Sequence, residues 1–125
     1  MNWTAIGAIF LALAVAMGAF GAHALKGRLD AYSLSVYEKA VFYHFIHALG
    51  ILLISLLARA GVVSASGGTR VAWLLAIGIL LFSGSLYALA ISGTRILGAI
   101  TPFGGVAFIA GWLLLAYGSL RAARV

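Results

Sequence analysis

The chain has 125 residues, of which 65% are hydrophobic and only 8% are charged, so it lacks the polar side chains that a soluble domain of this size needs on its surface. Its formal net charge of +6 does not indicate nucleic-acid binding, because the basic residues lie at or beyond the ends of apolar segments rather than together on one face. The absence of cysteine excludes disulfides, iron–sulfur clusters and cysteine-based zinc sites. Composition therefore predicts an integral membrane protein.

Four long apolar runs predict four membrane-spanning helices. A helix needs about 20 predominantly apolar residues to cross the roughly 30 Å hydrocarbon core, and each run reaches or approaches that length. We therefore predict an all-α fold with a single membrane domain over residues 1–125, in which an integral membrane four-helix bundle has antiparallel helices joined by short loops. The predicted helices cover approximately residues 2–25, 36–59, 70–92 and 102–121.

The first predicted helix has signals at both ends. Asn2 has the side-chain oxygen of an N-cap residue, and Gly27 lies just past the end of the apolar run, where a left-handed residue is preferred. The tripeptide Ala22-His23-Ala24 is similar to a signal-peptide cleavage site. However, no Lys or Arg precedes the apolar stretch, which is also longer than a usual signal-peptide core. We expect this helix to be retained.

The second and third predicted helices begin after polar residues. Ser35 followed by Glu38 forms a capping-box pattern, in which each side chain satisfies an amide at the helix start, so the second helix is predicted to begin near residue 36. Thr69 is the predicted cap of the third helix, and Ser92-Gly93 is its predicted end.

The fourth predicted helix has the clearest start in the chain. Thr101 is expected at the N-cap. Pro102 fits the first helical position, because a backbone N–H at that position has no hydrogen-bond acceptor within the helix and proline has no N–H to leave unpaired. Gly104 and Gly105 follow, with amides of a kind that binds anions at helix starts. Because no other phosphate-binding element accompanies them, we assign these residues to helix capping and packing.

Small residues are expected at the contacts between helices, because close backbone approach favours helix association in lipid. Gly18 in the first helix and Ser83-Gly84-Ser85 in the third belong to this set. The serines invite comparison with an intramembrane serine protease, which needs an activating base and an oxyanion pocket, but Ser83 and Ser85 fall on different faces of a helix and four short spans leave little room for a water-filled site. We therefore predict packing and no enzymatic activity.

Three histidines are the strongest candidates for chemistry. His23 lies near the end of the first helix, and His44 and His47 lie near the start of the second, so all three are expected toward the same membrane face. An ionisable group within the membrane is a functional hypothesis by default. The favoured interpretation is structural: neutral histidines, with Tyr43 and other neighbours, form polar contacts that hold helices together.

Two other interpretations of the histidines stay open. In one, His23 and His47 hold a haem or a quinone between the first two helices. In the other, the protein is a small proton or solute conductor in which His47 titrates. A metal site is not predicted, because the only carboxylates are Asp30 and Glu38, and the expected state has no cofactor.

Topology follows from the number of helices. With four spans, both termini share one side of the membrane with the loop between the second and third helices. The basic residues divide evenly between the sides, so the positive-inside rule does not choose between orientations, and we place both termini in the cytoplasm because the amino terminus is free. The terminal side carries Arg59, Arg70, Arg121 and Arg124, and the other side carries Lys26, Arg28, Lys39 and Arg95.

Four motifs, in this order and spacing, give the chain a specific resemblance to a known family. They are Gly18-Ala19-Phe20-Gly21-Ala22-His23-Ala24-Leu25, then Tyr43 with His47-Ala48-Leu49, then Phe82-Ser83-Gly84-Ser85-Leu86-Tyr87, then Gly98-Ala99-Ile100-Thr101-Pro102-Phe103-Gly104-Gly105 followed by Gly111-Trp112.

Together these motifs resemble the small bacterial inner-membrane family catalogued as domain of unknown function 423, which is also similar to a small eukaryotic transmembrane protein. The resemblance covers essentially the whole chain. It implies four helices, an inner-membrane location and importance for His23 and His47, and it brings no established activity, substrate or cofactor. His44 departs from the family pattern, in which glutamine is expected, so a pair of His44 and His47 is not a family feature.

From these observations we expect a non-enzymatic membrane protein that acts by packing. Its extramembrane mass is almost nil, and several helices offer small-residue faces. The expected role is an accessory or stabilising subunit of a larger membrane complex, or a homo-oligomer, in contact with the lipid bilayer and without a nucleic-acid partner.

Overall fold

The computed structural model describes residues 1–123, and 87% of the chain is helical. The predicted all-α fold is confirmed, because four helices are long and apolar enough to span a membrane and no strand occurs within residues 1–123. The helical segments in chain order are α1 (Trp3–Phe20), a π-helical turn (Gly21–Leu25), α2 (Ala31–Arg59), α3 (Ala65–Gly78), a second π-helical turn (Ile79–Ser83), α4 (Gly84–Ser92), a 3-10 helix (Arg95–Ala99) and α5 (Thr101–Ala122).

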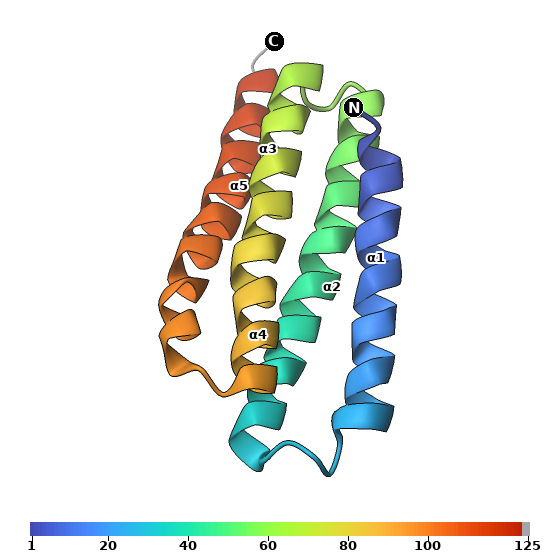
Figure 1. The fold of residues 1–125 in the computed structure, drawn as a ribbon. Coiled ribbons are helices and arrows are strands. Elements are labelled where there is room, and N and C mark those ends of the chain that lie inside the picture. The colour runs from blue at the N-terminus through green and yellow to red at the C-terminus, as the bar shows by residue number, and fades with distance from the viewer. Residues whose placement is uncertain (124–125) are drawn as a thin grey trace.

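The four spans run antiparallel in an open row (Figure 1). Span one joins α1 to the first π-helical turn, span two is α2, span three runs from α3 through the second π-helical turn to α4, and span four contains α5. The α1 helix packs mainly on α2, α2 also packs on α3 and α4, and α5 packs mainly on α3. The outer edges of the row are therefore α1 and α5, and the start of α1 and the end of α5 lie at the end that holds the α2–α3 loop (Figure 1).

The start of α2 differs from the prediction. The helix begins more than one turn before residue 36, with Asp30 as its N-cap, and the Asp30 carboxylate accepts a hydrogen bond of 2.7 Å from the amide of Ser33. The predicted capping box of Ser35 and Glu38 is wrong, because the Ser35 hydroxyl instead donates to the carbonyl of Tyr32 at 2.7 Å. A carboxylate is also favoured at a helix N-terminus by the helix dipole, so Asp30 is the stronger cap.

The start of α3 also lies earlier than predicted. Ser64 is its N-cap and accepts a hydrogen bond of 3.0 Å from the amide of Gly67, so Thr69 lies inside the helix and its predicted capping role is wrong. The loop between α2 and α3 contains several residues that can cap a helix, and the chain uses the one nearest the turn. The helix of the third span is therefore longer than the apolar run from which it was predicted.

The α5 helix begins at Thr101, which places Thr101 one position further in than predicted. Ile100 occupies the N-cap without a side-chain cap, and the Thr101 hydroxyl is hydrogen-bonded to Ser85 instead. Pro102 lies in the first turn, as predicted. The predictions for Asn2 and Gly93 are confirmed, since Asn2 accepts a hydrogen bond of 3.0 Å from the Ala5 amide and Gly93 ends α4 with φ of +72°.

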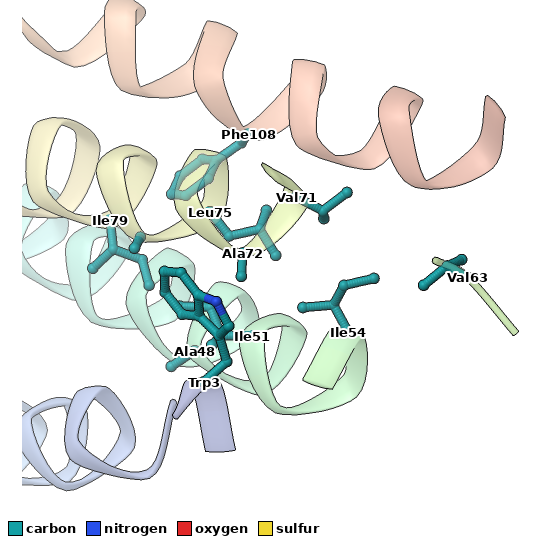
Figure 2. Packing of buried hydrophobic residues seen from close by; sticks show 11 residues of the cluster. Trp3, Ala48, Ile51, Ile54, Val63, Val71, Ala72, Leu75, Ile79 and Phe108 are labelled. Atoms are coloured by element: carbon teal, nitrogen blue, oxygen red, sulfur yellow. The ribbon is translucent and has the colours of Figure 1, made fainter. Parts of the chain in front are cut away.

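The main hydrophobic core lies where α2 and α3 meet α1 and α5. Phe108 from α5 and Trp3 from the start of α1 reach the buried faces of the two central helices (Figure 2). A second cluster, toward the opposite end, joins the first π-helical turn to α2 and α4. The main core contains Trp3, Ala48, Ile51, Ile54, Val63, Val71, Ala72, Leu75, Ala76, Ile79 and Phe108, and the second contains Leu25, Val36, Tyr37, Ala40, Leu86, Leu89 and Ala90.

Candidate polar site within the helices

Two of the three predicted histidines lie inside the protein. His44 and His47 both lie on α2 and are 4% and 5% exposed. Although they are only one turn apart, they have different neighbours: His44 contacts residues of α1 and α4, whereas His47 contacts α5. The sequence could place the pair on one face of α2 but could not say which helices would cover it.

His44 links α2 to α4. Its Nδ1 is hydrogen-bonded to the hydroxyl of Tyr87 at 2.9 Å, and the ring of Phe10 from α1 lies edge-on at 6.1 Å between centroids. Its Nε2 is buried and has no hydrogen-bond partner among residues 1–123. The Tyr87 hydroxyl therefore supplies the polar contact of this imidazole within the described residues.

His47 is held in an aromatic stack. Its Nδ1 donates a hydrogen bond of 2.8 Å to the carbonyl of Tyr43, one turn earlier, so Nδ1 carries a proton. The ring of Phe108 lies parallel to the imidazole at 3.5 Å between centroids, and the Tyr43 and Trp112 rings both lie at 5.8 Å. The imidazole thus joins α2 to α5 by stacking.

Hydroxyl groups form further links between the spans. Ser83, which is fully buried in the second π-helical turn, donates to the carbonyl of Ala40 at 2.8 Å, across the contact with α2. Ser85 and Thr101 are hydrogen-bonded at 2.6 Å, which ties α4 to the start of α5. In membrane helices such bonds are individually modest, at about 0.6 kcal/mol on average, but each requires a particular rotation of its helix.

The glycines predicted for packing differ sharply in their surroundings. A Cβ on Gly104 would lie 2.7 Å from the Cα of Phe82, so α5 and the second π-helical turn can approach only because residue 104 has no side chain. At Gly18 and Gly105 the nearest atoms would lie at 3.6 and 3.9 Å, which is ordinary contact. A Cβ on Gly84 would meet no atom within 4 Å in the described part of the chain, so the expected packing role of Gly84 is not seen.

The structure does not bring His23 to His47. His23 is exposed in the first π-helical turn. In the antiparallel pair of spans Gly21 lies against Tyr37, which places His23 opposite residue 35, and His47 lies about 12 residues further along α2. At 1.5 Å per residue this is about 18 Å, so one haem or quinone cannot be ligated by both side chains.

Metal-binding geometry is also missing from the described residues. Within residues 1–123, no three His, Asp or Glu side chains lie close enough together to hold an ion. The arrangement that remains is a set of polar and aromatic contacts between helices.

Several residues of this arrangement were not predicted. Tyr87, Phe108, Phe10 and Trp112 contact the histidines, and the π-helical geometry that presents Ser83 was not expected. Aromatic residues occur all along the apolar runs, so no local signal distinguishes those that meet a histidine. The motif that ends in Tyr87 was recognised as part of the family resemblance, but its contact with His44 could not be read from it.

A protein-family comparison identifies the chain. The protein-family model described as "Protein of unknown function (DUF423)" matches residues 17–105, which is more than half of the sequence. The chain belongs to this family. The match includes the first three recognised motifs and the Thr101–Gly105 segment.

Relatives of the family cover nearly the whole chain. It is 48% identical to the UPF0382 membrane protein SSP2132 of Staphylococcus saprophyticus, over 93% of this chain and 94% of that protein. It is 46% identical to the UPF0382 membrane protein YwdK of Bacillus subtilis, again over 93% and 94%. The printed names of these relatives and the four apolar helices agree on a multi-pass membrane protein. No solved structure matches the chain.

Proposed function

We propose that this protein is a non-enzymatic structural component of the membrane that associates with further transmembrane helices through α1. The observation that carries the proposal is the place of α1 in the fold: it lies at one edge of the row and packs mainly on α2 (Figure 1). Only 17% of the residues in its most apolar window are buried, against 50% in the third span. Much of α1 therefore remains free to contact lipid or another protein.

The free side of α1 carries a stripe of small side chains. At 100° per residue the stripe is about 80° wide, and it extends for 14 residues, or about 21 Å. Such a stripe lets another backbone approach closely, which is the main source of helix association in lipid. Its members, all exposed, are Ala5, Ala8, Ala12, Ala16 and Ala19.

The opposite edge of the row has a different surface. The free side of α5 carries large apolar side chains that are 61–69% exposed, and such side chains make favourable contact with lipid tails. The α1 helix also exposes Ile9, Leu13 and Val15 beside the stripe, so the contrast lies in the alanine stripe alone, which supports a protein partner for α1 and lipid for the free side of α5. The exposed large residues of α5 are Phe103, Val106, Ile109, Leu113 and Leu120.

The polar interior supports a structural role rather than a chemical one. Ser83 and Ser85 donate to backbone carbonyls, and the His47 imidazole lies against the Phe108 ring. A serine nucleophile needs a base within hydrogen-bond reach, and neither serine is hydrogen-bonded to a histidine in the described residues.

The location that we propose is the bacterial inner membrane, with both termini in the cytoplasm. The bacterial sources of the relatives support a bacterial membrane, and the common end of the start of α1 and the end of α5 supports one side of that membrane for both (Figure 1). Arg124, one of the basic residues counted for this side, lies outside the described residues. A fluorescent reporter that matures only in the cytoplasm, fused to the carboxyl end, tests the orientation: a dark fusion with normal membrane insertion contradicts it.

The association is tested by native mass spectrometry after gentle extraction from the native membrane. We expect the 13.0 kDa chain in a larger assembly, either with a foreign subunit, as for an accessory protein, or as a multiple of its own mass. Ala12→Ile places a branched side chain in the stripe and should dissociate either assembly.

Ala116→Ile is the matched control, because Ala116 is an exposed alanine on α5 outside the stripe, and this variant should keep the assembly. A wild-type protein found only as a 13.0 kDa monomer, or an assembly that survives Ala12→Ile unchanged, refutes the proposal.

A further inference from the structure

A hollow of about 470 Å³ opens where three spans end on the side of the termini. It lies between the first residues of α1, the last turn of α2 and the first turns of α3. Its polar lining residues are Asn2, Trp3, Thr4, Ser55, Arg59 and Thr69, and it is closed on the apolar side by Ile54, Ala58 and Ala72. It is separate from the histidine contacts and from the alanine stripe of α1.

Trp3 contributes a buried donor without an acceptor. Its side chain is 8% exposed, and its indole Nε1 has no hydrogen-bond partner among residues 1–123. The ring lies in the core beside Ile54 and Ala72, two residues that also line the hollow (Figure 2). The nitrogen itself is covered by protein atoms and does not open into the hollow, so Trp3 contributes its ring to the wall.

The remaining polar groups of the hollow favour a ligand that carries several hydrogen-bond acceptors. Thr4 and Ser55 are hydrogen-bonded to each other at 2.7 Å, and one of the two hydroxyl protons is used in that bond, which leaves the other for a ligand. Arg59, the last residue of α2, brings a positive charge and up to five N–H donors. No carboxylate lines the hollow.

The charge of this end of the molecule is entirely positive among the described residues. Arg59, Arg70 and Arg121 lie here, whereas the two acidic residues of the chain, Asp30 and Glu38, lie at the start of α2, at the other end. An anion in the hollow would therefore meet no like charge nearby, and it would lie at the depth where tryptophan and arginine contact lipid headgroups.

We propose that this hollow binds a phosphate group, with Arg59 as the counter-charge and the Thr4–Ser55 pair as a hydrogen-bond donor. Phosphate chemistry can come from an anionic phospholipid headgroup or from free inorganic phosphate. The apolar wall formed by Ile54, Ala58 and Ala72 fits the glycerol and upper acyl carbons of a lipid. The two sources differ in whether the apolar part of the ligand contributes to binding.

The test measures retained ligand by native mass spectrometry of the purified protein in neutral detergent. The probes are phosphatidylglycerol, phosphatidylcholine and inorganic phosphate at equal concentrations. We expect phosphatidylglycerol to be retained in preference to phosphatidylcholine, and Arg59→Gln to lower its retention about tenfold, which is typical of losing a hydrogen bond to a charged group. Competition by inorganic phosphate identifies free phosphate as the source, and its failure to compete identifies the lipid headgroup.

Two further variants separate the site from general charge attraction. Thr4→Val removes one hydroxyl of the Thr4–Ser55 pair and keeps a branched side chain of similar size, and Ala65→Leu fills the hollow from an exposed position without changing charge. Both should lower retention at least several-fold. Arg121→Gln is the control, because it removes the same charge at the same membrane side from a residue that does not line the hollow.

Equal loss in Arg59→Gln and Arg121→Gln would overturn the proposal in favour of nonspecific attraction. A wild type that retains neither phosphatidylglycerol nor inorganic phosphate in preference to phosphatidylcholine, or unchanged retention in Ala65→Leu, would overturn it as well. Far-ultraviolet circular dichroism and thermal unfolding are recorded for every variant, so that only folded proteins are compared.

Discussion

The closest approach between backbones provides the sharpest prediction about stability. Gly104 on α5 lies against Phe82 in the second π-helical turn, and an added Cβ would lie 2.7 Å from the Phe82 Cα. The Phe82 amide nitrogen would lie nearer still, and ordinary van der Waals contact begins at 3.4 Å, so Gly104→Ala requires the two segments to separate by more than about 0.7 Å. The obstacle is backbone rather than a flexible side chain, so neither segment relieves the clash by a rotamer change.

Overpacking of this kind costs about 1–3 kcal/mol. Against it stands the gain in helix propensity of roughly 0.5–1 kcal/mol when alanine replaces glycine inside a helix. The matched control Gly105→Ala makes the same propensity gain, but its Cβ would lie 3.9 Å from the nearest Phe82 atom. The difference in the free energy of unfolding between the two variants, about 1–3 kcal/mol, therefore isolates the close approach.

The assay is unfolding in mixed micelles with increasing sodium dodecyl sulfate, followed by circular dichroism. We expect Gly104→Ala to unfold at lower detergent fraction than Gly105→Ala, because separation of α5 also strains the 2.6 Å hydrogen bond between Ser85 and Thr101. If Gly104→Ala is as stable as Gly105→Ala, the packing argument is refuted, since both variants share every other effect.

Three further predictions concern side chains that join the helices. His47→Ala should lower the free energy of unfolding by about 2–4 kcal/mol, because a cavity forms beside Phe108, whereas His47→Phe should restore most of the loss by stacking; equal losses in micelle unfolding contradict this. Tyr87→Phe removes the polar contact of buried His44 and should cost about 1–3 kcal/mol in the same assay, and an unchanged midpoint contradicts it. The pKa of Asp30 is held below its ordinary value of 3.8 by the hydrogen bond that its carboxylate accepts from the Ser33 backbone N–H. The ionised cap therefore stabilises the protein above pH 3.8, and this stabilisation is lost as the pH falls through the lower pKa of the folded state. Thermal unfolding of Asp30→Asn should lack this pH-dependent loss of stability.

The helical spans were predictable because hydropathy is a local property of the chain. Each apolar run is long enough to require a helix in lipid, where every backbone group must be satisfied within its own segment. Cap positions were predicted less well. Asn2, which lies further out than Thr4, was correct, whereas Ser35 and Thr69 were displaced by Asp30 and Ser64, which lie further from the apolar run. Hydropathy does not record how far a helix continues beyond the hydrocarbon.

The sequence by itself therefore determined the membrane location, the four spans and the family. Only the tertiary structure decided that His44 contacts Tyr87 and that His47 contacts Phe108. It also decided that a side chain at residue 104 would clash with the neighbouring backbone, whereas one at residue 84 would not, and that His23 lies far from His47. The physical reason is that both faces of a membrane helix are apolar, so the pattern of residues does not reveal which face points inward. Helix rotation and register are set by close packing between spans, and they become visible only when the helices are assembled.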